Sequence, residues 1–518
     1  MENEGSSATP KAFDTAATAA PALIQEIEAI AEQTPQKSPS EQEKPMPADN
    51  FDADIVVIGA GPGGYVAAIR AAQLGAKTIC VEKEYLGGTC LNVGCIPSKA
   101  MIASVEALNH VKHCKAFGVK IECEPQMDFA AMMARKEKIV LAQRGGIGML
   151  FKKNGIRHVE GFASFIDKNT IEVAGRDKKK ESIRAKNFIL AMGSGVIHIP
   201  IPGLTPGREN NVWTSDEAVT AEFVPKSMLI LGGGAVGVEF GYVFNGLGTD
   251  TTIVEMMPSL IPMMDADLGA ELGKLLGRQG IKIKLGSTLE KVERKGKGWK
   301  CFIKKGSETE EVEVEVILLG VGRKAMTDEM NLEKIGLKLH RRGVEVLDDT
   351  LKTHVPNIYA IGDVIGKSML AHVASMEGIY ASTNAFTGEE RKIDYKAIPN
   401  CVYTIPEVAS VGLTQSEAEA QGHDVVIGKA NFRIFGKAMA IEERDGFVKI
   451  VAEKKYGEVL GVHMVGPHVT DMIAAATAAI KLEATIEIMA DTIHAHPTLA
   501  EAMLEAYEDA TGHAIHKM

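Results

Sequence analysis

The sequence predicts an α/β protein with two doubly wound units, followed by a separate α+β domain. From Ala53 onward, segments of strand type and helix type alternate, and a G-x-G-x-x-G string stands between a strand and a helix twice, at 59–64 and at 232–237. After Pro399 the pattern changes to strands such as 447–451 and then to helices. The length of 518 residues suits three or four domains better than a single core.

Residues 1–50 differ in kind from the rest. They are rich in Ala, Pro, Ser, Glu and Gln and hold a single aromatic side chain, so this composition predicts a disordered arm. One short stretch of the arm suits either a transient helix without a partner or a docking helix for a larger assembly. Its apolar face holds Leu23, Ile24, Ile27 and Ile30.

Composition limits the function classes and the compartment. The net charge of -11 argues against general affinity for nucleic acid or for an anionic membrane surface. No apolar run is long enough to span a bilayer, and the N-terminus has neither a secretory signal pattern nor an arginine before Arg70. The seven cysteines are scattered and form no C-x-x-C pair, so neither a zinc site nor a secreted disulfide framework is expected. These features together predict a protein of the cytoplasm with no metal site.

Each of the two glycine strings carries the signature of a dinucleotide site. The first strand is expected at 53–58 with its helix running to about Leu74, and the second at 228–231 with its helix running to about Leu247. The first two glycines of such a string let the turn and the phosphates approach, and the third lets helix and strand pack. These glycines are Gly59, Gly61 and Gly64 in the first string and Gly232, Gly234 and Gly237 in the second.

A glutamate follows each string at the end of the next strand. Glu82 and Glu255 both stand 18 residues after the last glycine, close to the position where a carboxylate binds ribose hydroxyls. The alternative to two dinucleotide sites is a pair of strand–turn–helix units whose glycines serve packing alone and bind no ligand. Glu255 would repel a 2′-phosphate and has no arginine beside it, so the second site predicts NAD and not NADP.

Residues 87–99 read GGTCLNVGCIPSK, with Cys90 and Cys95 five positions apart in a glycine-rich turn. Two cysteines this close form and break a disulfide with little backbone motion, as redox chemistry requires. A regular helix would rise about 7.5 Å over this interval, beyond the roughly 7 Å that a disulfide tolerates between α carbons, so a distorted turn is expected. The alternative is a pair of reduced, buried cysteines that act as small apolar side chains.

This string closely resembles the redox-active segment of the flavin disulfide reductases, and among them of the dihydrolipoamide dehydrogenases. The resemblance covers about residues 52–518. It assigns the first glycine string to FAD and the second to a nicotinamide cofactor. It also implies that Cys90 is the thiol that exchanges with substrate and that Cys95 is the thiol that faces the flavin.

The resemblance further implies a domain organisation with two Rossmann-like dinucleotide-binding domains and a C-terminal α+β dimerisation domain. Its parts are an arm (1–50), a first part of the FAD-binding domain (51–197), an NAD-binding domain (198–324), a central part that completes the FAD domain (325–398) and an interface domain (399–518).

Other stretches match the same family. Tyr359–Asp363 resembles the segment whose aspartate binds the flavin ribityl chain, and Met369–His372 resembles the segment that contacts the flavin ring. Lys99 and Glu239 stand where relatives pair two charges near the reactive flavin nitrogen, although a surface position is the plainer interpretation of Glu239. Further cofactor contacts are expected at Gly322, Gly362, Asp363 and Ala371. The string Lys324-Ala325-Met326 departs from the proline-containing turn of the relatives.

The C-terminal string His494-Ala495-His496-Pro497-Thr498-Leu499-Ala500-Glu501 resembles the catalytic segment of the family. A thiol needs a base at neutral pH, and a histidine oriented by a carboxylate can serve as one. By resemblance His496 is the base, Glu501 is its partner and His494 is structural. The segment reaches the disulfide of the other subunit in this family, which implies a homodimer. An isolated His-x-His would instead suggest a surface pair or a weak metal site.

The resemblance implies FAD-dependent oxidation of protein-bound dihydrolipoamide to lipoamide, with reduction of NAD+ to NADH. The implied partners are the lipoyl domains of 2-oxo acid dehydrogenase acyltransferases or the lipoyl-bearing H-type protein of glycine cleavage. Two alternatives stay open: another NAD(P)H-dependent flavin disulfide reductase, and a docking subunit of a multienzyme complex.

Overall fold

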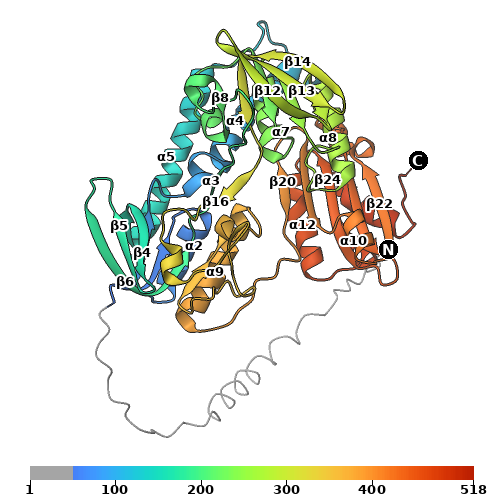
Figure 1. Cartoon of the computed structure of the whole chain (residues 1–518). Coiled ribbons are helices and arrows are strands. Elements are labelled where there is room, and N and C mark those ends of the chain that lie inside the picture. Colours follow the sequence, from blue (N-terminus) through green and yellow to red (C-terminus); the bar gives the residue numbers. More distant parts are fainter. Residues whose placement is uncertain (1–50, 518) are drawn as a thin grey trace, which may run out of the picture. The chain divides into compact units, whose positions relative to one another are not determined.

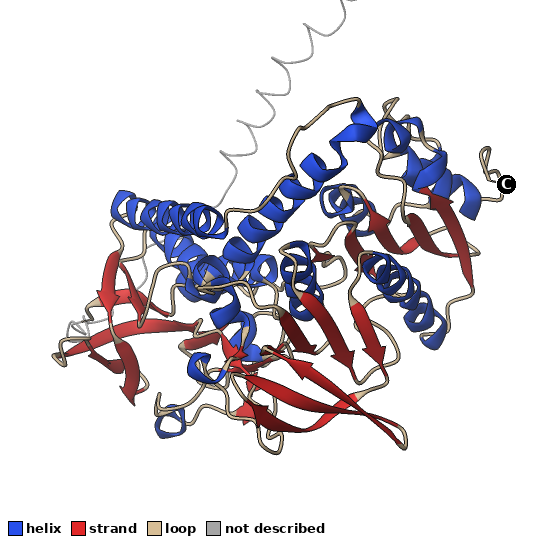
Figure 2. Ribbon diagram, turned by 90° about the horizontal axis from the view of Figure 1, so that it is seen from above, coloured by secondary structure: helices blue, strands red, loops and turns tan. Residues whose placement is uncertain are grey.

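A computed structural model describes residues 51–517 of the chain. The predicted arm (1–50) and its apolar stretch lie outside these residues. The described part forms three main sheets with their covering helices, and the colours of Figure 1 follow the chain through them from blue to red. In Figure 2 the red strands and the blue helices of these layers can be told apart.

The first sheet has the strand order β3-β2-β1-β6-β5-β4, and β19 also pairs with β6. The long strand β6 pairs in parallel with β1 and β19 through its second half and antiparallel with β5 through its first half. A late segment of the chain therefore enters the sheet that the earliest segment begins. The strands are β1 Ala53–Ile58, β2 Thr78–Glu82, β3 Arg157–Glu160, β4 Phe162–Asp167, β5 Thr170–Ala174, β6 Lys180–Leu190 and β19 Ile358–Ala360.

The helices around this sheet are α2 Pro62–Gln73, α3 Gly88–Asn92, α4 Cys95–His113, α5 Phe129–Lys153 and α9 Ala371–Thr387. The orange helix α9 lies against the blue helix α2 although the two are far apart in sequence (Figure 1). Gly378 permits this approach, because a Cβ there would lie 2.5 Å from the Gly63 carbonyl oxygen.

The second sheet is parallel, with the order β11-β10-β9-β15-β8. Its strands are β8 Val212–Trp213, β9 Ser227–Leu231, β10 Asp250–Glu255, β11 Lys282–Leu285 and β15 Val316–Leu319, and its helices are α6 Ser215–Val219, α7 Ala235–Gly246 and α8 Ala266–Arg278. A three-stranded antiparallel ribbon, not predicted from the sequence, follows β11 and consists of β12 Thr288–Lys295, β13 Gly298–Lys305 and β14 Glu308–Val314.

The two connections between the first and second sheets pair with each other. The short strand β7 (Ser194–Val196) runs antiparallel to β16 (Arg323–Ala325), and the Met326 N–H donates to the Gly193 carbonyl oxygen. The string that departs from the family pattern, 324–326, thus takes part in this two-stranded junction. A further small ribbon joins β17 Leu339–His340 and β18 Gly343–Val344.

The C-terminal sheet is antiparallel, with the order β20-β21-β24-β23-β22. Its strands are β20 Asn400–Val402, β21 Glu407–Gly412, β22 Val425–Asn431, β23 Phe447–Glu453 and β24 Val459–Gly466, and its helices are α10 Gln415–Ala420, α11 Gly436–Ala440, α12 Val469–Lys481, α13 Ile486–Ala490 and α14 Glu501–Ala510. The predicted fold class, two doubly wound α/β units followed by a C-terminal α+β domain, is confirmed.

One apolar core cluster connects three parts of the described chain. It contains Met101 of α4, Phe240 of α7 and Leu268 of α8, and it continues into Val408 and Val465 of the C-terminal sheet. Because close-packed cores transmit displacement, these parts are mechanically connected. Among residues 51–517 no helix is both long and apolar enough to cross a membrane.

Candidate active site

The two cysteines of the redox motif lie on different helices. Cys90 belongs to the single turn α3, and Cys95 is the first residue of α4. The left-handed φ angles of Gly87 (92°) and Gly88 (55°) lead into α3, and the break at Gly94 separates the two helices. This is the distorted turn that the spacing predicts. Both cysteines are free in this structure.

The two thiols differ in acidity. The pKa of Cys95 is lowered to about 7, chiefly because it accepts a hydrogen bond from Cys90; burial opposes the shift and the Lys99 ammonium supports it. The pKa of Cys90 is raised far above its ordinary value, because its proton is held in that hydrogen bond and burial disfavours a second thiolate. The helix N-terminus at Cys95 also favours a thiolate there. Cys95 is therefore the better leaving group of the two.

Lys99 lies one turn beyond Cys95 on α4 and pairs with a buried carboxylate. Its Nζ is 2.7 and 2.9 Å from the two oxygens of Glu239 on α7. Glu239 is only 6% exposed, so the interpretation of this residue as a surface position is wrong. Tyr403 completes the cluster: its N–H donates to Glu239 Oε1, and its ring centroid lies 4.4 Å from Lys99 Nζ. The Lys99–Glu239 pair therefore joins α4, a helix of the first sheet, to α7, a helix of the second sheet. Through Tyr403 it also contacts the segment that follows β20 of the C-terminal sheet.

Asn92 lies between the two cysteines and ties their loop to α5. Its Nδ2 donates to the carbonyl oxygens of Leu86 and Gly88 at 3.0 and 2.9 Å. Its Oδ1 accepts two hydrogen bonds from Arg144, and the Arg144 guanidinium stacks 4.0 Å from the centroid of the Tyr85 ring. Arg144 and Tyr85 could not be predicted from sequence spacing, although Asn92, a polar residue inside the cysteine motif, is a signal that could have pointed to them.

The first glycine string forms a tight cradle between β1 and α2. Gly59 has φ +101°, and a Cβ there would lie 2.2 Å from the Ala191 carbonyl oxygen. A Cβ on Gly64 would lie 1.8 Å from the Gly59 carbonyl oxygen, whereas beside Gly61 the nearest atom would be the Gly88 Cα at 4.0 Å. Only the middle glycine faces open space, as the approach of a phosphate requires.

The second string repeats this geometry between β9 and α7. Gly232 has φ +107°, and a Cβ there would lie 2.4 Å from the Gly320 carbonyl oxygen. A Cβ on Gly237 would lie 1.9 Å from the Gly232 carbonyl oxygen, and one on Gly234 would meet nothing within 4 Å. Two backbone cradles of the same form therefore fit the pyrophosphates of two dinucleotides.

The two glutamates occupy equivalent places beside these cradles. Glu82 accepts the Ala60 N–H at 2.7 Å and the Glu84 N–H at 2.8 Å. Glu255 accepts the Gly233 N–H at 2.6 Å and the Met257 N–H at 2.7 Å. Each carboxylate is thus held beside its loop, and its remaining lone pairs suit the hydroxyls of a ribose.

A polar chain fixes Asp363, the residue expected at the flavin ribityl group. Asp363 accepts a hydrogen bond from the Ser194 hydroxyl, and Arg323 in turn donates to that hydroxyl at 2.7 Å and to the Ser194 carbonyl oxygen at 2.6 Å. Gly322, just before this arginine, has φ +110°. The junction between β7 and β16 therefore positions the aspartate.

Behind Asp363 lies a fully buried carboxylate. Glu377 of α9 accepts the Gly362 N–H at 2.5 Å and the Tyr395 hydroxyl at 2.7 Å, and burial raises its pKa. Ala371 begins the same helix, whose N-cap residue provides no side-chain cap, so the first-turn N–H groups are available to a ligand. Glu377 was not among the predicted site residues; the signal that could have indicated it is a glutamate among the small and apolar residues of α9.

His496 and Glu501 form a pair at the start of α14. His496 Nδ1 lies 2.8 Å from Glu501 Oε1, and the His496 side chain is 76% exposed. His494, expected to be structural, has its Nδ1 2.8 Å from the Thr492 carbonyl oxygen. Within the described chain no hydrogen bond or ion pair joins His496 to Cys90 or Cys95.

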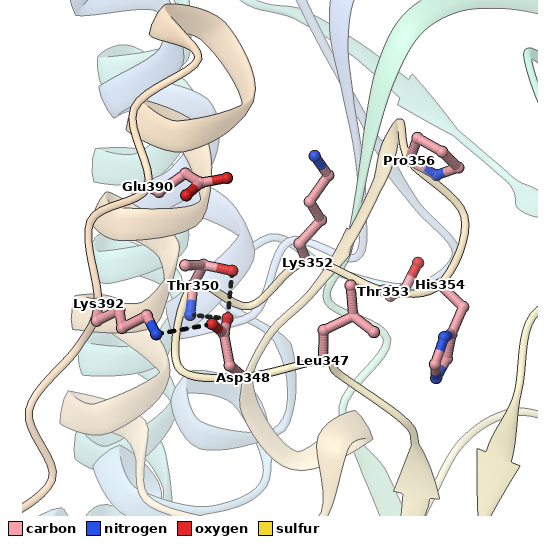
Figure 3. Close-up of a pocket in the computed structure, with 9 residues that line it drawn as sticks. All are labelled: Leu347, Asp348, Thr350, Lys352, Thr353, His354, Pro356, Glu390 and Lys392. Atoms are coloured by element: carbon pink, nitrogen blue, oxygen red, sulfur yellow. Dashed lines mark hydrogen bonds and ion pairs between the residues drawn. The ribbon is translucent and has the colours of Figure 1, made fainter.

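The predicted site residues therefore fall into two groups: the cysteines with Lys99, Glu239 and the two cradles, and the separate His496–Glu501 pair. A surface hollow of about 350 Å³ lies elsewhere, where Lys352 and Glu390 flank a Thr350–Asp348–Lys392 network (Figure 3). None of its lining residues is a predicted site residue. Across residues 51–517 no group of three or more His, Cys, Asp or Glu side chains is arranged to hold a metal ion.

Comparison with known proteins places these features in a family. Residues 53–378 match the family model described as pyridine nucleotide-disulphide oxidoreductase, and residues 398–507 match its dimerisation domain. The chain is 41% identical over 469 residues to a dihydrolipoyl dehydrogenase of Haloferax volcanii, covering 90% of this chain and 98% of that protein. It is 40% identical to the mitochondrial dihydrolipoyl dehydrogenase of Pisum sativum, covering 88% of this chain and 90% of that protein.

A solved structure shares the fold. The HOCl-induced flavoprotein disulfide reductase RclA from Escherichia coli, as its Cu(II) complex, superposes with a TM-score of 0.79 at 24% identity, covering 88% of this chain and 99% of that chain.

Proposed function

Because the chain belongs to the pyridine nucleotide-disulphide oxidoreductase family, we propose that it oxidises dihydrolipoamide to lipoamide and reduces NAD+ to NADH with release of one proton. The observation that carries this proposal is the unequal thiol pair beside the Lys99–Glu239 ion pair, in a chain with two dinucleotide cradles. FAD and NAD are the cofactors of this enzyme class, and the two cradles fit them.

The cysteine pair takes part in the thiol half of the reaction. A thiolate of dihydrolipoamide attacks Cys90 Sγ in the oxidised pair, and Cys95 leaves as the thiolate, which the Lys99 ammonium and the N-terminus of α4 stabilise. The second substrate thiolate then attacks the substrate sulfur bonded to Cys90, which closes the lipoamide ring and releases Cys90. The substrate loses two electrons and the cysteine pair gains them. Bound FAD supplies the two-electron path from this dithiol to NAD+.

A base must take the substrate protons. Glu501 holds Nδ1 of His496, which leaves Nε2 to accept a proton from the substrate thiol and to return one to Cys90. The high exposure of His496 and the absence of any bond to the cysteines of its own chain support a site shared across a dimer. We assign the base of each site to His496 of the partner subunit. The match to the family's dimerisation domain supports the homodimer that this assignment requires.

The remaining cofactor contacts follow the cradles. Gly59, Gly61, Gly64 and Glu82, with Gly362, Asp363 and Ala371, would hold FAD; Gly232, Gly234, Gly237, Glu255 and Gly322 would hold NAD. We assign the sheet that β19 completes to the FAD domain (51–197 and 325–398) and the parallel sheet of β8–β15 to the NAD domain (198–324). The paired strands β7 and β16 mark the boundary between them.

The proposed physiological substrate is a lipoyl group carried by a protein of a 2-oxo acid dehydrogenase complex or of glycine cleavage, in the cytoplasm. The relatives at about 40% identity that are named dihydrolipoyl dehydrogenase support this choice over another disulfide substrate.

The proposal is tested by adding dihydrolipoamide anaerobically to the purified flavoprotein without NAD+. Reduction of the flavin spectrum, followed by NADH release when NAD+ is added, is the expected result. Cys95→Ser should abolish both. Cys114→Ser changes a half-buried cysteine outside the proposed chemistry and should behave as the native protein does. A flavin that NADH bleaches and dihydrolipoamide leaves unchanged would refute lipoamide as the substrate while leaving the cofactors in place.

A further inference from the structure

A row of polar residues crosses one face of the C-terminal sheet. Lys429, Lys449, His463 and Ser410 are directly paired neighbours on β22, β23, β24 and β21. Lys449 and His463 are almost fully buried, with 3% and 1% exposed. Burying a lysine is costly unless a carboxylate meets it. The partner here comes from another part of the chain, at the start of α8.

That partner is Asp265. Lys449 Nζ lies 3.0 and 3.1 Å from its two oxygens, and both side chains are 4% exposed. Asp265 also caps α8 by accepting the Asp267 N–H, and it accepts the Gln415 N–H at the start of α10. The carboxylate of Asp265 is therefore bound by two residues of the dimerisation domain, Lys449 and Gln415. The same carboxylate caps the first turn of α8, a helix of the proposed NAD-binding domain.

Asp265 also ends the loop that begins at Glu255. In that loop the Ile261 N–H donates to the Gly233 carbonyl oxygen at 2.8 Å, inside the second glycine string. Ile261 has φ +43°, a left-handed conformation that a β-branched residue adopts only under strain. Such a conformation persists only where the surrounding structure holds it in place.

Close packing connects the helix, the loop and the glycine string. A Cβ on Gly269 of α8 would lie 2.3 Å from the Leu260 carbonyl oxygen, and a Cβ on Gly233 would lie 2.7 Å from Leu260 Cδ2. A shift of the α8 terminus therefore displaces the loop, and a shift of the loop displaces the backbone that would receive the pyrophosphate.

We propose that Asp265, held by Lys449, is a positioning residue of the NAD site: the ion pair lets the dimerisation domain set the position of the Gly232–Gly237 loop. This inference rests on the proposed assignment of NAD to that loop. Without Lys449, the carboxylate of Asp265 loses its buried partner and turns toward water. The α8 terminus and the strained loop then relax, and the glycine string no longer matches the pyrophosphate.

The test compares Lys449→Met with two other variants of the full-length holoenzyme. Lys429→Met is the matched control, because Lys429 stands in the same row but is more exposed and pairs with Asp267 only, whereas Lys449 pairs with both Asp265 and Asp267. Lys449→Arg restores a cation that can bind both carboxylate oxygens. Two quantities are measured: the dissociation constant of NAD+ for the oxidised protein, by calorimetry, and the rate of anaerobic flavin reduction by dihydrolipoamide.

We expect Lys449→Met to weaken NAD+ binding about ten-fold while flavin reduction by dihydrolipoamide keeps its rate. Lys449→Arg should recover most of the affinity, and Lys429→Met should change neither quantity. Native NAD+ affinity in Lys449→Met would overturn the proposal, and so would an equal loss in both measurements, because that result describes a general structural role.

Two further outcomes are distinguishable. If dihydrolipoamide fails to reduce the native flavin, the proposed substrate is wrong, yet the NAD+ titration still decides this inference. If Lys449→Met does not fold, Asp265→Asn replaces it, because asparagine keeps the helix cap and removes the charge. Weaker NAD+ binding by Asp265→Asn supports the proposal, and unchanged binding overturns it.

Discussion

Glu501 holds Nδ1 of His496 at 2.8 Å, and the same carboxylate accepts the Thr498 N–H at 2.8 Å through its other oxygen. Partial burial alone would raise the pKa of Glu501, but the hydrogen bonds from His496 and Thr498 bring it below its ordinary value. The carboxylate is therefore ionised at neutral pH, so Nδ1 carries the proton and Nε2 is free to act as a base.

Replacing Glu501 with Gln should lower kcat for dihydrolipoamide oxidation by about 10²-fold, because the histidine loses both its fixed tautomer and its counter-charge. NADH-dependent reduction of a one-electron dye should stay near native, since it bypasses the base. Glu508→Gln, on the same helix, is the control. Native turnover of dihydrolipoamide by Glu501→Gln would contradict the role of the pair.

The thiolate of Cys95 should appear as the pH rises through about 7. Because the pKa of Cys95 is lowered to about 7, its thiol is protonated below this pH and ionised above it, whereas an ordinary thiol would still be protonated there. The long-wavelength absorbance that a thiolate gives beside an oxidised flavin, recorded in the two-electron-reduced holoenzyme, should follow this titration.

The charges near Cys95 should move that midpoint in opposite directions. Lys99→Met removes a cation that favours the thiolate and should raise the midpoint by about one pH unit, whereas Glu239→Gln removes an anion that disfavours it and should lower the midpoint. Midpoints that stay fixed in both variants would show that the ion pair does not act on this thiol.

The middle and last glycines of the second string should respond differently to alanine. Gly237→Ala places a Cβ 1.9 Å from the Gly232 carbonyl oxygen, so it should lower the free energy of unfolding by about 1–3 kcal/mol. Gly234→Ala meets no protein atom and should leave Tm near native while weakening NAD+ binding. Thermal melts and NAD+ titrations separate the two effects, and equal loss of Tm in both variants would argue against an open phosphate site.

Glu255 should decide the choice between NAD and NADP. Glu255→Arg should raise kcat/KM for NADPH relative to NADH, because a cation replaces the charge that repels a 2′-phosphate. Since Glu255 also accepts the Gly233 and Met257 N–H groups, Glu255→Gln is the companion variant, in which an acceptor remains and the charge is lost. An unaltered preference in both variants would refute the assignment.

The parts of the fold that the sequence predicts are those with a local signature. The strand, glycine string, helix and glutamate of each nucleotide unit follow one another within thirty residues of chain, and α2 ends at Gln73, one residue before the predicted end. The ribbon β12–β14 has no such signature. In its last strand, β14 (ETEEVEV), polar and apolar residues alternate only near the end, and most side chains are exposed. This strand is specified by its pairing with β13 and not by a pattern of its own.

The same distinction applies to the candidate site. Cys90, Cys95 and the glycines stand in short strings that can be read directly. Glu377, Arg144 and Tyr403 are ordinary residue types whose partners are distant in sequence, as Arg144 is from Asn92 and Tyr403 from Glu239. Only the folded chain brings these groups together, so their roles follow from packing and not from spacing.

The place of β19 beside β6 has a consequence for biosynthesis. A ribosome releases the strands of the second sheet, whose last member ends at Leu319, before it releases Ile358–Ala360. Because domains generally fold as units during synthesis, the part of the chain that forms the second sheet should be folded while the first sheet still lacks β19 and Asp363 is not yet made. On the proposed assignment of FAD to the first sheet and NAD to the second, flavin capture therefore belongs to a late stage of translation, after the proposed NAD-binding domain has formed.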